Sequence, residues 1–122
     1  MAKDSKIIVR TVGDVTVIEV HGNLDIQLSQ AMKIKLESLI KFGHQKIVVN
    51  LKDTNFIDST GVGSLMYGLK LIDPTVGDLK LTGLAPHHVN VFNVLELDRV
   101  FSIFPTEEGA VSSFLINGAT MH

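Results

Sequence analysis

Short runs with strand periodicity alternate with longer segments of helical periodicity along most of this chain. The segment Ile47–Leu51 is apolar almost throughout, as a strand covered on both faces should be, and it follows a helical pattern over Leu24–Phe42. This alternation favours parallel strands joined by right-handed crossovers, because a helix packs back onto a twisted sheet with that hand. The pattern therefore predicts an open α/β sheet flanked by helices.

The chain opens with a predicted β-hairpin. β-branched residues lie on both sides of the pair Gly13-Asp14, in the segments Ile7–Val9 and Val15–Val20. Gly22 is expected to end the second of these strands. Further strands are expected at Ile47–Leu51, Asp78–Thr82 and Val100–Phe104.

Four helices are predicted after the hairpin. The first spans Leu24–Phe42 and stops at Gly43, and the second begins near Asp58 and ends before Pro74. The third and fourth begin close to prolines, which suit a first helical turn. The expected apolar faces contain Leu28, Ala31, Met32, Leu36, Leu39 and Ile40; then Val62, Leu65, Met66, Leu69 and Ile72; then Val89, Phe92, Val94 and Leu95; and last Ala110, Val111, Phe114 and Leu115.

No linker, repeat or low-complexity tract interrupts this order of elements. We therefore expect a single α/β domain over residues 1–122, with a mixed, mostly parallel open sheet of about five strands, an N-terminal antiparallel hairpin and about four flanking helices. Binding sites in such sheets gather at the carboxyl ends of the parallel strands. That edge is expected to hold three loops, Gly22–Asp25, Thr54–Gly63 and Gly83–Pro86.

Composition and charge exclude several classes of function. Eleven Lys and Arg stand against thirteen Asp and Glu, for a net charge of -2, and there is no Trp. Such a chain lacks the basic face and the aromatic platform that nucleic-acid binding needs. The absence of cysteine excludes disulfides and thiolate metal sites. No stretch reaches the roughly 18 apolar residues of a membrane helix, and Met1–Lys6 lacks signal-peptide architecture, so we expect a cytoplasmic protein.

The segment Asn55–Leu65 is the most unusual part of the chain. Gly61 and Gly63 lie in the first turns of a predicted helix, where each glycine costs about 1 kcal/mol relative to alanine. They indicate close approach of a sheet, a phosphate or another protein. In the simplest interpretation Asp58 or Ser59 is the helix N-cap. In the functional one, the exposed Ser59 hydroxyl accepts a phosphate, which the unpaired N–H groups of a helix start tolerate.

Asp25 precedes the first predicted helix and has two interpretations of the same kind. It is an N-cap in the simpler one, and in the other its carboxylate orients the Ser59 hydroxyl and later repels a phosphate. Apolar residues around this edge form a small docking patch wherever they are exposed, although each fits the core equally well. These residues are Leu24, Ile26, Ile57 and Val62.

No enzymatic motif is complete in this part of the chain. Gly61–Met66 lacks the third glycine of a dinucleotide fingerprint, Gly68 lacks the lysine that follows the last glycine of a phosphate-binding loop, and Ile57–Gly61 lacks the first glycine of a nucleophile elbow. The five His residues form no i, i+4 pair, and no carboxylate cluster accompanies them. We therefore expect no catalytic residues, no metal site and no cofactor.

The string Ile57–Gly63, preceded by Lys46–Leu51, resembles the signature of the bacterial anti-sigma factor antagonists of the STAS-domain family. The loop Gly22–Asp25 is similar to that family's loop after its second strand, and the similarity extends from Ile7 to Phe114. The resemblance implies a partner switch controlled by phosphorylation of Ser59.

In such a switch an anti-sigma factor, which is also a serine kinase and brings its own ATP, phosphorylates the antagonist. The unphosphorylated antagonist binds the anti-sigma factor and frees the sigma factor, phosphorylation blocks binding, and a PP2C-type phosphatase restores it. The resemblance makes this chain a substrate and ligand rather than an enzyme. The partner-binding residues that it implies are Asn23, Leu24, Asp25, Ile57, Asp58, Ser59, Thr60, Gly61, Val62 and Gly63.

A second hypothesis remains open beside the switch. In it the chain is a constitutive STAS scaffold or a transporter-associated subunit, and Ser59 is only a helix cap. The sequence also departs from the family pattern at three places. Asn23 stands where Glu is common, Asp73–Val76 replaces a more basic, Gly-rich turn, and Glu96 stands where a glycine often closes the third helix.

Overall fold

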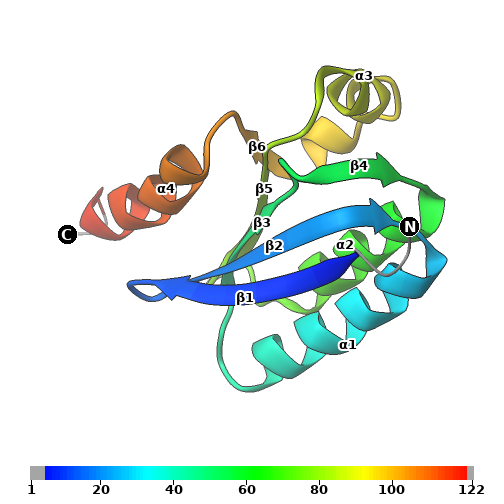
Figure 1. The fold of residues 1–122 in the computed structure, drawn as a ribbon. Coiled ribbons are helices and arrows are strands. Elements are labelled where there is room, and N and C mark those ends of the chain that lie inside the picture. Colours follow the sequence, from blue (N-terminus) through cyan, green and yellow to red (C-terminus); the bar gives the residue numbers. More distant parts are fainter. Residues whose placement is uncertain (1–4, 121–122) are drawn as a thin grey trace.

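The computed structural model describes residues 5–120, and this part of the chain forms six strands and four α-helices. Figure 1 shows how these elements are arranged. The absence of a signal peptide was inferred from Met1–Lys6, of which residues 1–4 lie outside the described part. No helix within residues 5–120 has the length and apolar character that crossing a bilayer requires. In chain order the elements are β1 Lys6–Val12, β2 Val15–Leu24, α1 Ile26–Lys41, β3 Lys46–Asn50, β4 Thr54–Ile57, α2 Ser59–Leu71, β5 Asp78–Thr82, α3 Pro86–Val94, the short 3-10 helix η2 Leu97–Arg99, β6 Ser102–Phe104 and α4 Glu107–Thr120.

The strands form one mixed sheet in the order β1-β2-β3-β5-β6. β1 and β2 pair antiparallel, with Val12 opposite Val15, and all other pairs are parallel. The turn between β1 and β2 is Gly13-Asp14, where Gly13 has the positive φ of 62° that this kind of hairpin turn requires. The predicted fold class and hairpin are therefore confirmed.

The carboxyl end of β2 differs from the prediction. β2 does not end at Gly22 but continues to Leu24, and its last residues pair with β4, which lies in the segment predicted as a loop. Gly22 permits this because its φ of +100° produces an irregularity in the strand, and Ser5 lies where a side chain would otherwise stand. β4 raises the strand number to six and brings the chain before α2 against the end of β2.

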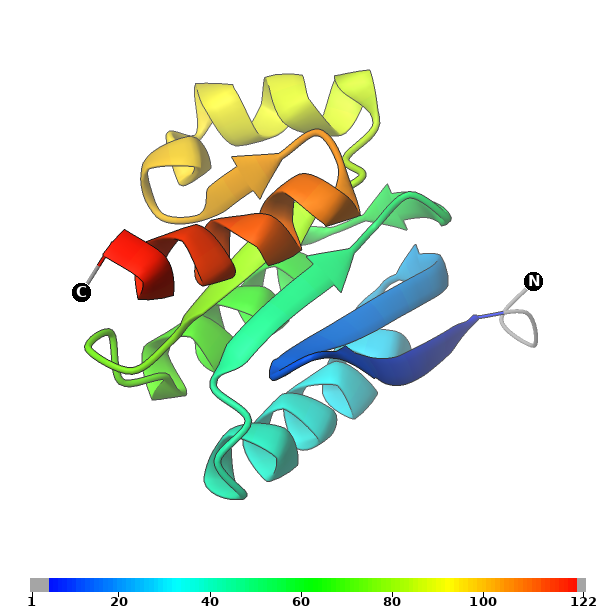
Figure 2. The same ribbon diagram turned by 90° about the vertical axis from the view of Figure 1, so that its left-hand side faces the viewer.

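The helices cover the two faces of the sheet unequally. Alternate residues of β2 point to opposite sides, so Ile18 packs in a core with α1, α2 and α3, whereas Val17 packs under α4. In Figure 2 α4 crosses the sheet on the viewer's side, whereas α1 lies along the lower edge of the view. Burial on both faces explains why β3 is apolar almost throughout, as the sequence predicted.

The predicted apolar faces are largely confirmed but contain four errors. Val94 and Leu95 are 80% and 60% exposed at the end of α3, Leu115 is 60% exposed on α4, and Ala31 is exposed on α1. Each is an apolar residue that fits a helical period by its spacing but is not covered by another element. Periodicity gives the direction of a side chain, whereas its burial depends on the extent of the element opposite.

The buried face of α2 consists mainly of small residues. Gly61, Ser64, Leu65 and Gly68 are buried, whereas Val62, Met66 and Leu69 of the predicted stripe are only half-buried. A Cβ atom on Gly68 would lie 2.7 Å from Leu36 Cδ1, so α1 and α2 pack too closely for a larger residue. The sequence prediction followed the large apolar residues and therefore placed the buried face one position off.

The turn after α3 passes through Glu96, which is the one non-glycine residue within the described part of the chain to have a positive φ, 58°. This left-handed conformation costs a residue with a Cβ atom about 1–2 kcal/mol. This is the position at which the family pattern described above has glycine. Glycine suits this turn because it carries no such cost.

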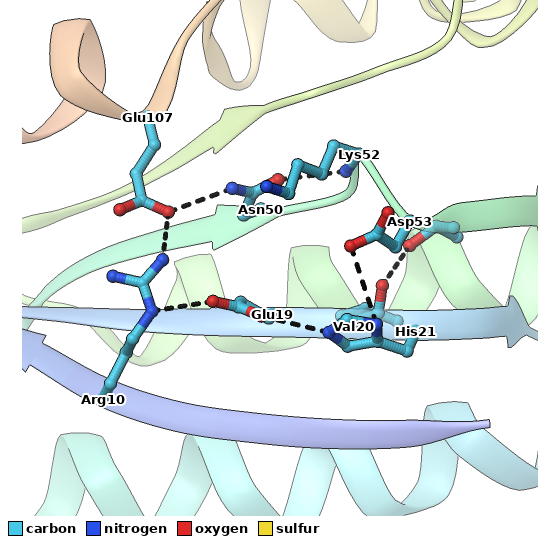
Figure 3. A network of polar contacts seen from close by, with 9 residues as sticks. Arg10, Glu19, Val20, His21, Asn50, Lys52, Asp53 and Glu107 are labelled. Atoms are coloured by element: carbon cyan, nitrogen blue, oxygen red, sulfur yellow. Dashed lines mark hydrogen bonds and ion pairs between the residues drawn. The ribbon is translucent and has the colours of Figure 1, made fainter. Parts of the chain in front are cut away.

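A polar network joins the first turn of α4 to the sheet (Figure 3). The Arg10 guanidinium donates to Glu107 at 2.5 Å and to Glu19 at 2.7 Å, and the Asn50 amide donates to the same Glu107 carboxylate at 3.0 Å. The bond from Arg10 lowers the pKa of Glu107, and Asn50 contributes in the same direction. This contact therefore stabilises the fold only while Glu107 is ionised.

Replacing Glu107 with glutamine is expected to lower the free energy of unfolding by about 1–2 kcal/mol at neutral pH. A carboxylate whose pKa is lowered on folding stabilises above its ordinary pKa of 4.5, and that stabilisation disappears as the pH falls through the lowered value. The difference between wild type and Glu107→Gln should therefore be constant from about pH 6 to 8 and shrink below about pH 4.5 in urea unfolding curves. The exposed neighbour Glu108→Gln is the control, and an equal loss in both variants would contradict the assigned role.

Candidate functional site

Four chain segments meet at the carboxyl end of β2. Asn23 and Leu24 of β2 pair with Phe56 and Ile57 of β4, and α1 and α2 begin directly after these two strands. The two helix starts are in contact, because the Ser29 hydroxyl in the first turn of α1 donates to the Thr60 hydroxyl in the first turn of α2 at 3.5 Å. The strand ends and both helix starts lie together at the right of Figure 1. We call this region the Ser59 edge.

An aspartate caps each of the two helices. Asp25 has an extended backbone, and its carboxylate accepts the Leu28 N–H at 3.2 Å. Asp58 is the equivalent cap of α2, and its Oδ1 accepts the Gly61 N–H at 2.9 Å. Asp25 is therefore the N-cap of α1, as the simpler interpretation of the sequence predicted. The N-cap of α2 is Asp58 and not Ser59.

Ser59 and Thr60 are adjacent hydroxyl residues in different environments. The Thr60 hydroxyl donates to Asp58 Oδ1 at 2.5 Å and also accepts the bond from Ser29. Ser59 is the first residue of α2 and is exposed, and its hydroxyl makes no hydrogen bond within residues 5–120. The Thr60 hydroxyl is therefore held inside the protein, whereas that of Ser59 is free of partners within the described residues.

Asp58 is a carboxylate next to this free hydroxyl. Hydrogen bonds from the Thr60 hydroxyl and then from the Gly61 N–H lower the pKa of Asp58. Asp58 therefore stays ionised at neutral pH. Its Oδ1 atom already accepts two hydrogen bonds from within the protein. The Ser59 edge presents a neutral hydroxyl flanked by a fixed negative charge.

The two glycines of the motif have different structural roles. A Cβ on Gly61 would lie 2.5 Å from the Leu24 carbonyl oxygen and 3.1 Å from Ile57 Cγ2, so α2 packs directly onto the ends of β2 and β4. A Cβ on Gly63 would meet nothing within 4 Å, and Gly63 is exposed. Contacts within the described part of the chain explain Gly61 and do not explain Gly63.

The structure brings together all ten predicted partner-binding residues, but it does not expose all of them. Ser59, Thr60 and Gly63 are exposed, and Asn23, Asp25, Ile57, Asp58 and Val62 are half-buried. Leu24 and Gly61 are buried beneath this surface, and the role of the ten residues in partner binding stays a prediction. The third predicted loop, Gly83–Pro86, follows the carboxyl end of β5, and Gly83 lies against Asn50 and Lys52 at the neighbouring end of β3, so this loop lies at the predicted edge of the sheet.

Sequence reasoning missed one exposed aromatic residue at this edge. Phe56 is 52% exposed, next to the half-buried Ile57. Phe56 lies two residues after the buried Thr54 on β4, so strand alternation alone does not account for its exposure. Ile26 is the exposed member of the four apolar residues named around the edge, at 59%.

The chain is similar in sequence to proteins of one family. The sequence model of the STAS domain matches residues 6–110. The anti-sigma-B factor antagonist of Bacillus subtilis (strain 168) is 28% identical over 94 residues, which cover 77% of this chain and 85% of that protein. The anti-sigma F factor antagonist of Paenibacillus polymyxa is 26% identical over 100 residues, which cover 81% and 83%.

Solved structures share the fold. An anti-sigma factor antagonist from Mycobacterium paratuberculosis superposes with a TM-score of 0.83 at 18% identity, over 93% of this chain and 96% of that one. The antagonist SpoIIAA in its unphosphorylated form superposes with a TM-score of 0.72 at 23% identity, over 89% and 97%. Its phosphorylated form gives 0.70 at 23% identity, over 89% and 99%. With the match over residues 6–110 and the strand order above, these similarities show that the chain belongs to the STAS domain family.

Proposed function

We propose that this chain is an anti-sigma factor antagonist whose binding is switched by phosphorylation of Ser59. In the unphosphorylated state it binds a cytoplasmic anti-sigma factor that is also a serine kinase, and the sigma factor is freed. The relatives named above are anti-sigma factor antagonists, and SpoIIAA has a phosphorylated and an unphosphorylated form. The observation that carries the proposal is the exposed hydroxyl of Ser59, which has no hydrogen-bond partner within residues 5–120.

The covalent step belongs to the kinase. The Ser59 oxygen forms a bond to the γ-phosphorus of the kinase's ATP, the bond from that phosphorus to ADP breaks, and the hydroxyl proton passes to a base of the kinase. A PP2C-type phosphatase reverses the modification by hydrolysis and returns the free hydroxyl. This chain supplies the acceptor oxygen and the docking surface, and no catalytic group.

A phosphate at Ser59 changes the charge of this surface strongly. It adds about -1.5 to -2 charges, and the segments that form the Ser59 edge, residues 22–32 and 53–69, contain no Lys or Arg. The N–H groups at the start of α2 accommodate the phosphate in the free protein. A partner that covers Ser59 must instead remove the phosphate from water, which strongly opposes binding.

Incubation with the partner kinase and ATP is expected to add one phosphate, at Ser59 and not at Thr60. The reason is that the Thr60 hydroxyl is held by Asp58 and Ser29, whereas that of Ser59 is free. Mass spectrometry of the digested protein locates the phosphate. Thr60→Ala should still be phosphorylated, and Ser59→Ala should not. Phosphate at Thr60, or none on the wild type with a kinase shown to be active, would overturn the proposal.

The competing hypothesis of a constitutive scaffold is not favoured by the geometry. It required Ser59 to be a helix cap, and the cap of α2 is Asp58. The Ser59 hydroxyl therefore does not cap α2.

A further inference from the structure

A polar cleft lies between the carboxyl ends of β3 and β5 and the first turn of α4. Its volume is about 400 Å³. Ligands of open α/β sheets bind at the carboxyl ends of the strands, which is where this cleft lies. None of the residues that line it belongs to the segments 22–32 and 53–69, which form the Ser59 edge. The cleft is therefore a second candidate site, separate from Ser59.

The hydroxyl of Thr82 lies on the floor of this cleft without a hydrogen-bond partner. Thr82 is the last residue of β5 and lines the cleft, it is 1% exposed, and its Oγ1 atom makes no hydrogen bond among the residues that the structure describes. Lys80, two residues earlier, donates to Ser113 of α4, so strand alternation directs Thr82 toward α4 as well. Buried hydroxyl groups are nearly always hydrogen-bonded, because an unpaired one costs free energy. This hydroxyl therefore indicates a ligand in the cleft.

The charged side chains that line the cleft leave one charge of each sign. Arg10 and Glu107 form an ion pair, and Asn50 donates to the same carboxylate (Figure 3). Lys52 and Glu108 also line the cleft, and both are exposed at its rim. A ligand with one carboxylate and one ammonium group matches both of them. A ligand with a single charge would leave either Lys52 or Glu108 without a partner.

An apolar cleft of about 330 Å³ adjoins the polar one. The two clefts share Gly83 and Pro105, and apolar side chains that include Leu84, Val89 and Ile103 line the second. Small-molecule sites typically combine an apolar lining with a few polar groups that orient the ligand. A ligand that spans the two clefts therefore has charged groups at one end and an apolar group at the other.

We propose that these two clefts bind an α-amino acid with a large apolar side chain, of the leucine or phenylalanine class. Its carboxylate accepts hydrogen bonds from the Thr82 hydroxyl and the Lys52 ammonium group, close to the start of α4, where free N–H groups favour an anion. Its ammonium group pairs with Glu108, and its side chain lies against Leu84 in the apolar cleft. The inference goes beyond the proposed switch, because binding of this ligand does not depend on a phosphate at Ser59.

NMR spectra of the backbone amides, recorded while the full chain is titrated with L-leucine or with L-phenylalanine, test the class of ligand. Both amino acids should shift the signals of Thr82, Gly83 and Glu108 until they saturate, with half-saturation at or below about 1 mM. 4-Methylpentanoate lacks the ammonium group, 3-methylbutylamine lacks the carboxylate and glycine lacks the side chain. Each of these three compounds should bind at least about 10-fold more weakly than leucine. No saturable shift with either amino acid up to about 10 mM, or equal binding of any of the three compounds, would overturn the inference.

Thr82→Val removes the hydroxyl and keeps the shape of the side chain, so it separates a ligand contact from a structural role. It should weaken leucine binding about 10-fold without lowering the midpoint of thermal unfolding, because the hydroxyl has no hydrogen bond to lose among the described residues. Lys52→Gln should weaken binding about 10-fold as well. Lys35→Gln, at an exposed position of α1 on the other face of the sheet, is the matched control and should change binding less than about 2-fold. Unchanged binding by Thr82→Val, or a lowered unfolding midpoint that assigns the hydroxyl a structural role, would overturn the inference.

Discussion

Ser59→Asp is expected to abolish most of the binding to the anti-sigma kinase, whereas Ser59→Ala should retain it. A permanent carboxylate in place of the hydroxyl puts an unpaired charge into the covered interface, and we expect a loss of about 100-fold, or about 3 kcal/mol. Alanine removes only a hydroxyl that makes no hydrogen bond within residues 5–120. Calorimetric titration of the purified kinase with each variant measures the difference.

A pull-down with the same two variants separates the switch from a scaffold. Beads carrying Ser59→Ala should retain the kinase from a lysate of the source bacterium, and beads carrying Ser59→Asp should not. Ser112→Asp, at an exposed position of α4 outside the Ser59 edge, serves as the control with an identical change in net charge and should retain the kinase. If Ser59→Ala and Ser59→Asp retain the same proteins in the same amounts, the chain acts as a constitutive scaffold and the switch is refuted.

Gly61→Ala is expected to destabilise the fold strongly, whereas Gly63→Ala should stabilise it. The new Cβ at position 61 would lie 2.5 Å from the Leu24 carbonyl oxygen, which is backbone and cannot rotate away. We expect the free energy of unfolding to fall by about 2–3 kcal/mol, as is typical of overpacking that shifts the backbone. At position 63 the Cβ meets nothing within 4 Å, so alanine should add up to about 1 kcal/mol through its helix propensity.

Urea unfolding of the two variants, monitored by circular dichroism, measures this contrast without any partner. Both substitutions are made in the same helix, two residues apart, so propensity alone predicts the same sign for both. Stabilisation by Gly61→Ala would show that α2 does not pack against β2 as described. Binding by Gly63→Ala adds a second readout, because a stable variant with weakened kinase binding would place the partner against this exposed position.

Local patterns were sufficient for much of the architecture. Alternating and helical periodicity located the hairpin around Gly13-Asp14, the strand Ile47–Leu51 and the four helices, because the period of apolar residues reflects local backbone geometry. Capping residues are equally local, so the position of Asp25 before a helix was enough to offer a cap as the simpler of its two interpretations. The one strand that sequence reasoning missed, β4, has four residues and too little alternation to be distinguished from a loop.

The sequence located the candidate site, and the tertiary structure showed which of its hydroxyl groups is free. The Asp58-Ser59-Thr60-Gly61 string and its place before a helix are visible in the chain itself, and they indicate an exposed hydroxyl at a helix start. Which hydroxyl is free could not be read from the string. That choice depends on Ser29, a residue of another helix, and on the orientation of the Asp58 carboxylate.

The sequence by itself determined the alternation of strands and helices, the hairpin and the position of the Ser59 motif, because these follow from short-range geometry and propensity. Only the tertiary structure decided that β4 pairs with the end of β2, that Gly61 is buried while Gly63 is exposed, and that Phe56 faces outward. Those outcomes depend on contacts between segments far apart in the chain. Burial is a property of what packs against a residue, and no local pattern contains that information.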